Sequence, residues 1–131
     1  PPLATAAPSR IEGIGRQRVD PSFSGGVVDR MMSVPDAAAI GTVHALEQAT
    51  GIRAGGSTGT GLWAALRIVA EMVEAGEKGS VVSLICDSGE RYLDKYYSDE
   101  WLSSAGMNVA PYRDAVLQFL QSGDAGAFCG G

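Results

Sequence analysis

The sequence predicts an α/β fold in which a layer of parallel sheet is flanked by helices. Apolar runs typical of strands alternate with helical patterns, and the links between them are short. The run from Ser80 to Cys86 is almost continuously β-branched or apolar, which is typical of a strand buried on both faces. At 131 residues the chain is large enough for one domain. In such a sheet, ligands are expected beyond the carboxyl ends of the strands.

The first third of the chain is predicted to hold strands and loops. Residues 1–9 are rich in Pro, Ala and Ser without hydrophobic periodicity, so we expect a flexible lead-in. Residues 10–16 resemble a strand end that runs into a loop, with a simple turn as the alternative. A second strand is expected from Val27 to Val34, where Pro35 ends it.

Helical patterns dominate the remainder. Asp36 to Thr50 is Ala-rich and is followed by Gly51, which predicts a helix; His44 on it has no companion for a metal or a catalytic triad, so a surface histidine is expected. After the short strand Ile52–Ala54 and a glycine-rich turn, a second helix is expected to begin near Leu62. Its apolar positions share one face: Leu62, Leu66, Val69, Ala70 and Val73. Residues 103–131 are expected to form an extension with one amphipathic helix, which contains Tyr112, Val116, Phe119 and Leu120.

The charge and the cysteines limit the classes of function. A net charge of −5 and a pI near 4.7 argue against nucleic acid or an anionic membrane as partner. No run is apolar for the length of a membrane span, and the first residues lack the basic segment of a signal peptide, so a cytoplasmic protein is expected. Cys86 and Cys129 are expected to be unrelated thiols, and no metal site is expected.

Three loops follow predicted strands and are expected to meet at one edge of the sheet. They are Gly13-Ile14-Gly15, the turn from Gly55 to Thr60, and the segment from Asp87 to Tyr92. In the central turn the hydroxyls of Ser57, Thr58 and Thr60 lie beside unpaired helical N–H groups, a place that suits an anion or a polar ring atom. The alternative is an ordinary helix N-cap. In the third loop Asp87 or Ser88 is expected to cap a short helix.

Together these motifs resemble a known enzyme family. Glu12-Gly13-Ile14-Gly15, Gly51 to Thr60 and Cys86 to Leu93, in this order and at these separations, are similar to the C-terminal part of the cysteine synthase/cystathionine β-synthase family. These are pyridoxal phosphate enzymes of fold type II. The similarity runs from about Ser9 to Trp101, so residues 10–102 are expected to be the enzyme segment. The sequence from Ser88 to Trp101 resembles that of a bacterial cysteine desulfhydrase branch of the family.

The resemblance implies site residues and a cofactor. Ser57 would hydrogen-bond the pyridine nitrogen of pyridoxal 5'-phosphate, and its hydroxyl is too weak an acid to hold that nitrogen protonated. Gly13, Ile14, Gly15, Gly55 and Gly56 would line the cofactor, while Cys86 and Asp87 would close its far side. A small amino acid would be the substrate of a β-elimination or β-replacement. Whether the reaction releases sulfide or builds cysteine or cystathionine stays open.

The resemblance also implies groups that this sequence does not supply. Family members hold the cofactor on a lysine and its phosphate in a separate loop, and neither Lys78 nor Lys95 has the apolar surroundings that make a lysine nucleophilic. We therefore expect no catalytic residue in these 131 residues, and a sheet that is incomplete without the N-terminal portion of the same enzyme. The complete enzyme is expected to be a homodimer. The rival interpretation is a non-catalytic remnant that binds a partner or an anion at Gly55–Thr60.

Overall fold

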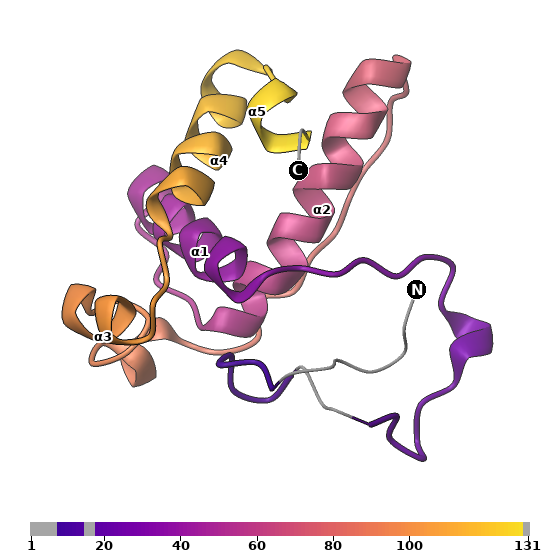
Figure 1. Ribbon diagram of the computed structural model, residues 1–131. Helices are drawn as coiled ribbons and strands as arrows, with labels where there is room; N and C mark the ends of the chain where they lie inside the picture. The colour runs from indigo at the N-terminus through magenta and orange to yellow at the C-terminus, as the bar shows by residue number, and fades with distance from the viewer. Residues whose placement is uncertain (1–7, 15–17, 130–131) are drawn as a thin grey trace.

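The computed structural model describes residues 8–14 and 18–129, and it shows a body of three helices (Figure 1). Helix α1 packs against both α2 and α4, and a short α5 adjoins α4 and α2. The lead-in predicted for residues 1–9 lies mostly outside the described residues, as does Gly15. The elements, in chain order, are η1 (Gly25–Val27), α1 (Asp36–Thr50), α2 (Gly56–Ala75), η2 (Gly89–Tyr92), α3 (Asp99–Ser104), α4 (Ala110–Ser122) and α5 (Gly126–Cys129).

Helix α1 is the centre of the body and confirms the helix predicted over the same residues. Small side chains let its neighbours approach closely, and Ala38, Ala39 and Ile40 are completely buried. The helix ends where Gly51 takes the left-handed conformation, with φ of 78°, and donates its N–H to the carbonyl of Glu47 at 2.7 Å. The predicted C-terminal helix is confirmed as α4, with Val116 and Phe119 buried.

Helix α2 begins six residues before the predicted start at Leu62. The glycine-rich turn is its first turn and a half, because Gly55 is the N-cap and Gly56 is already helical. Because glycine has a low helix propensity, the sequence predicted a loop for these residues. Close packing explains why glycine is used: a Cβ on Gly59 would lie 2.7 Å from the carbonyl carbon of Ala39 in α1.

The predicted strands do not form among the described residues. The only ladder contact there is an isolated antiparallel bridge between Ala54 and Ser88. The run from Ser80 to Cys86 has no helix or strand assignment, and Figure 1 shows it following α2 lengthwise. Val82 and Leu84 are 86% and 76% exposed, so the face expected to be buried is open. A strand needs backbone hydrogen bonds to a neighbouring strand, and the described segments supply none for this run. The parallel sheet is therefore unconfirmed.

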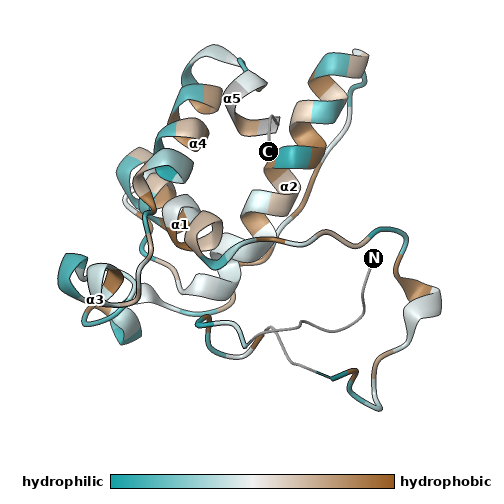
Figure 2. Cartoon of the chain, in the orientation of Figure 1, coloured by the Kyte–Doolittle hydropathy of each residue, from teal (hydrophilic) through white to brown (hydrophobic). Residues whose placement is uncertain are grey.

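Two hydrophobic clusters hold the helices together. One surrounds Tyr96 and joins Ile11 and the first turns of α1 to η2 and the segment that follows it. The other surrounds Trp63 and joins α1, α2, α4 and Phe128 of α5. Figure 2 shows brown, apolar residues on the facing sides of these helices and along part of the run beside α2. The first cluster is the one that positions the predicted site.

Candidate functional site

Backbone hydrogen bonds fasten the central glycine turn to the third predicted loop. Gly55 donates its N–H to the carbonyl of Asp87 at 3.1 Å, and Gly89 donates to the carbonyl of Arg53 at 2.9 Å. The hydroxyl of Thr58 accepts a further bond from the N–H of Cys86 at 3.0 Å. The thiol of Cys86 is free and exposed. Two segments that are about thirty residues apart in the sequence therefore form one rigid edge at the start of α2.

The first predicted loop lies against the same edge. Ile11 is 2% exposed, and its side chain occupies the space where a Cβ on Gly56 would lie, at 2.8 Å. The next residue, Glu12, donates its N–H to the hydroxyl of Tyr96 at 2.9 Å. Gly13 has φ of 84°, a conformation that favours glycine, and Ile14 packs on the Tyr96 cluster. The three predicted loops thus converge through Ile11 and Tyr96.

The hydroxyl side chains of the central turn do not cap α2. Gly55, the N-cap, makes no side-chain cap hydrogen bond. Thr60 donates its hydroxyl to the carbonyl of Gly56 at 3.3 Å, and Thr58 bonds Cys86. The hydroxyl of Ser57 is partly buried and makes no hydrogen bond within residues 8–14 and 18–129. The first turn of α2 therefore presents N–H groups and one serine hydroxyl without a side-chain cap.

Asp87 is held beside the glycine turn and is not the helix cap. Ser88 caps η2, because its hydroxyl accepts the N–H of Glu90 at 3.2 Å. One carboxylate oxygen of Asp87, Oδ2, accepts the hydroxyl of Tyr92 at 2.6 Å. The other, Oδ1, is buried without a hydrogen-bond partner among the described residues and contacts the space beside Gly55 where a side chain would lie. This hydrogen bond to Asp87, together with burial, raises the pKa of Tyr92 to about 12.

Because of the hydrogen bond between Asp87 and Tyr92, we expect the free energy of unfolding to fall at alkaline pH. The unfolded tyrosine loses its proton near pH 10, whereas the folded one keeps it to about pH 12. The stabilisation is therefore fully present below about pH 10 and is lost as the pH rises towards 12. Urea unfolding of the enzyme that contains this chain should show a fall in the free energy of unfolding over this range. Tyr92→Phe should reduce that fall, leaving the part due to Tyr97, whose pKa burial also raises to about 12, and should cost about 1.5–3 kcal/mol at neutral pH.

Tyr112→Phe is the matched control, because it removes a tyrosine hydroxyl from α4 and leaves the Asp87–Tyr92 bond intact. Its stability curve should follow that of the unchanged protein. If the curves of Tyr92→Phe and the unchanged protein ran parallel in alkali, the proton on Tyr92 would not be coupled to folding.

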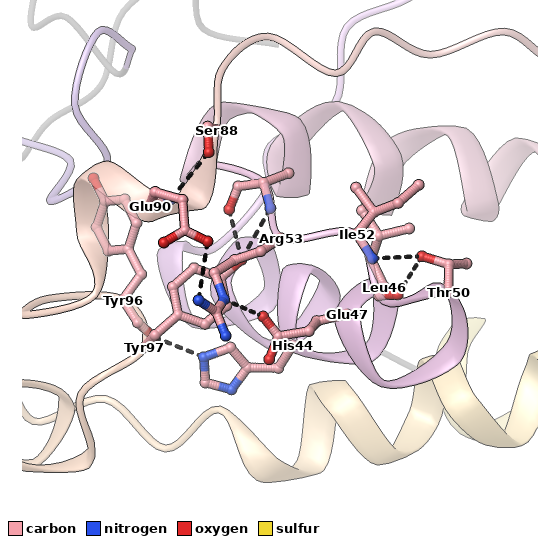
Figure 3. A network of polar contacts seen from close by, with 11 residues as sticks. His44, Leu46, Glu47, Thr50, Ile52, Arg53, Ser88, Glu90, Tyr96 and Tyr97 are labelled. Carbon is pink, nitrogen blue, oxygen red and sulfur yellow. Dashed lines mark hydrogen bonds and ion pairs between the residues drawn. The ribbon is translucent and has the colours of Figure 1, made fainter.

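A polar network joins α1 to the residues next to the glycine turn and to η2 (Figure 3). Arg53 binds Glu47 of α1 at 2.6 Å and Glu90 of η2 at 3.0 Å. Tyr97 donates its hydroxyl to the carbonyl of Ala54 at 2.6 Å. His44, expected on the surface, is partly buried: Nε2 lies 2.6 Å from the carbonyl oxygen of Tyr96, and the ring stacks on Tyr97. His44 is thus a structural link between α1 and the segment after η2.

Sequence reasoning missed the tyrosines that assemble this site. The hydroxyl of Tyr92 binds Asp87 of the third loop, and those of Tyr96 and Tyr97 bind Glu12 and Ala54, the residues directly before the first two loops. The only sequence signal was their clustering behind a capped turn. Short helix α3 was missed too, although Ser98 caps it by accepting the N–H of Trp101 at 3.2 Å.

Neither lysine approaches the convergent loops as a free amine. Lys95 donates to Glu12 at 2.9 Å, and this bond raises its pKa. Lys78 lies in an exposed stretch after α2. No cluster of metal-ligating side chains occurs in the described part of the chain. No helix there is long and apolar enough to cross a membrane.

Known proteins match much of this chain. No family model matches. The chain is 54% identical over 87% of its length to L-cysteine desulfhydrase Cds1 of Mycobacterium tuberculosis. It is 40% identical over 76% of its length to N-(2-amino-2-carboxyethyl)-L-glutamate synthase of Ralstonia nicotianae, and 34% identical over 60% to a putative cysteine synthase of Sinorhizobium fredii.

These alignments cover 31%, 29% and 22% of the respective relatives, so the chain spans about a third or less of the length of the proteins that it matches. The matched portion is C-terminal in the relatives. The similarity found in the three motifs is therefore confirmed by independent alignments to enzymes of one family. The chain is therefore similar to the C-terminal part of enzymes of the cysteine synthase/cystathionine β-synthase family, which are pyridoxal phosphate enzymes of fold type II.

Proposed function

We propose that this chain forms part of a pyridoxal phosphate-dependent enzyme that acts on cysteine or a similar amino acid by β-elimination or β-replacement. The observation that carries the proposal is the convergence of three glycine-containing loops on the first turn of α2, where Ser57 has a hydroxyl without a partner in the described residues. The name of the relative at 54% identity favours the desulfhydrase reaction. Bound pyridoxal phosphate would supply an electron-withdrawing ring.

The residues present fit such a ring. Gly55 and Gly56 let the loops pack closely around the start of α2, because a Cβ on Gly55 would meet Asp87 and Tyr92 and a Cβ on Gly56 would meet Ile11. The buried Oδ1 of Asp87 is an acceptor that no described group uses. Ser57 is proposed to bind the pyridine nitrogen, and Gly13, Ile14, Gly15 and Cys86 to lie around the ring. The pyridine nitrogen would stay unprotonated, because a serine hydroxyl is too weak an acid to protonate it.

The proposed role of Ser57 is tested by changing its acidity. In the enzyme that contains this chain, Ser57→Asp should keep the cofactor, shift its visible absorbance and lower sulfide release from cysteine by roughly tenfold or more, about 1.4 kcal/mol of barrier. The carboxylate would hold the ring nitrogen protonated and alter the reaction balance. Ser57→Ala should have a milder effect, since it removes a hydrogen bond without adding a charge.

Ser103→Asp is the control, because it adds the same charge at an exposed position of α3. An unchanged spectrum and an unchanged turnover in Ser57→Asp would leave Ser57 with a structural role only. If the protein that contains this chain bound no pyridoxal phosphate at all, the non-catalytic alternative would replace the proposal.

A further inference from the structure

A separate cavity of about 400 Å³ lies between the start of α1, the middle of α2, and α4 with α5. Its walls include Trp63 and Arg67 of α2, Tyr112 and Ala115 of α4, and Phe128 of α5. This volume is within the range of about 300–1,000 Å³ typical of small-molecule sites. Arg67 is eleven residues beyond Gly56, which is roughly 16 Å along the helix at 1.5 Å per residue, so the cavity is distinct from the loops that converge at the start of α2.

Aromatic rings form the apolar wall of the cavity and hold one another in place. Trp63 meets Phe128 with ring centroids 4.3 Å apart, and it meets Tyr112 edge-on at 5.6 Å. Trp63 is 6% exposed and Phe128 is 3% exposed, so both rings are fixed by packing. A ligand in the cavity would meet the small parts of Trp63 and Phe128 that this packing leaves exposed, in an orientation that is already set.

Arg67 gives the cavity a single cationic group with an unused donor. Its Nε is buried and has no hydrogen-bond partner within the described residues. The carboxylate one turn away, Glu71, accepts hydrogen bonds from Arg30 at 2.6 and 2.8 Å and none from this Nε, although the charge of Arg67 helps to lower the pKa of Glu71. A buried donor left unpaired is costly, and a guanidinium matches a carboxylate with two parallel hydrogen bonds.

We propose that this cavity binds a small aromatic carboxylate, with its ring against Trp63 and Phe128 and its carboxylate accepting hydrogen bonds from Arg67. The charge of the site selects the anion, and the aromatic walls select the ring. An inorganic anion would be bound by Arg67 alone, and a neutral aromatic compound would be bound by the aromatic walls alone. The inference does not depend on the reaction proposed above.

The proposal is tested by ligand-observed NMR titration of the cofactor-saturated protein that contains this chain. Phenylacetate is the probe, and phenylacetamide is its uncharged match. Phenylacetate should bind with a dissociation constant below about 1 mM, and phenylacetamide at least about tenfold more weakly. Arg67→Gln should abolish this difference, so that acid and amide bind alike. Arg67→Lys should keep part of it, because the charge remains and the fork of donors is lost.

Two further variants separate this cavity from binding elsewhere. Arg113→Gln removes one positive charge from α4 outside the cavity and should leave both affinities unchanged. Ala115→Leu fills the cavity with Arg67 retained and should weaken acid and amide together. A preference for the acid that persists in Arg67→Gln would place the binding at another site and overturn the proposal. No binding of phenylacetate by the folded, unchanged protein would overturn it as well.

Discussion

Replacing Gly59 by alanine is expected to lower the free energy of unfolding by about 3 kcal/mol. An added Cβ would lie 2.7 Å from the carbonyl carbon of Ala39, closer still to its oxygen, and 3.0 Å from Val43. These atoms belong to the backbone and core of α1, which cannot yield without separating the two helices. Since α2 also carries the site at its first turn, its displacement should loosen the bonds that join Gly55 to Asp87. Urea unfolding of the enzyme that contains this chain measures the effect.

Gly61→Ala provides the comparison two residues further along the same helix. Its Cβ would lie 3.2 Å from the hydroxyl of Ser83, a side chain that can rotate away, and Gly61 itself is exposed. Because alanine favours the helix over glycine by about 1 kcal/mol, this variant should be neutral or slightly more stable. Equal stabilities of the two variants would mean that α1 and α2 do not need the close approach at Gly59.

The chain by itself is expected to release sulfide from cysteine no faster than free pyridoxal phosphate does. The chemistry needs a lysine that binds the cofactor and moves a proton, and general acid–base catalysis alone commonly contributes about 10²–10⁴-fold. Lys95 is 42% exposed and paired with Glu12, which raises its pKa and favours the ammonium form. A nucleophilic lysine needs the opposite shift, towards the neutral amine.

Borohydride reduction in the presence of pyridoxal phosphate tests this expectation directly. Peptide mapping should find no specific pyridoxyl label on Lys78 or Lys95. Addition of the N-terminal segment of a related enzyme should be required for sulfide release. A label trapped specifically on either lysine, with turnover above that of the free cofactor, would show that these 131 residues hold a whole active site.

The sequence predicted the three long helices because their signals are local. The apolar stripes lie within each helix and Gly51 lies directly after α1, and α1 and α4 form where expected. The predicted start of α2 was wrong because glycine is required there by tertiary packing against Ala39. No local sequence pattern reveals this packing. The predicted strands depend on partners elsewhere, so a β-branched run was not enough to form them.

The site shows the same division between local and long-range information. The three motifs located the loops, and the structure brings the described parts of them together. The contacts that hold them were predicted only in part: Ser88 was one of the two expected caps, whereas neither the bond between Asp87 and the hydroxyl of Tyr92 nor that between Glu12 and Tyr96 was foreseen. The bond between Glu12 and Tyr96 spans 84 positions and depends on how distant segments pack, whereas sequence spacing reports only neighbours.

The open run from Ser80 to Cys86 has a consequence for amide hydrogen exchange. Its N–H groups have no ladder partners in the described residues, apart from the bond that Cys86 donates to the hydroxyl of Thr58. Amides in such a segment exchange with solvent as freely as those of a loop, whereas the amides of α1 are protected by the central packing of that helix. Slow exchange along this run would therefore report that another segment has paired with it, residue by residue.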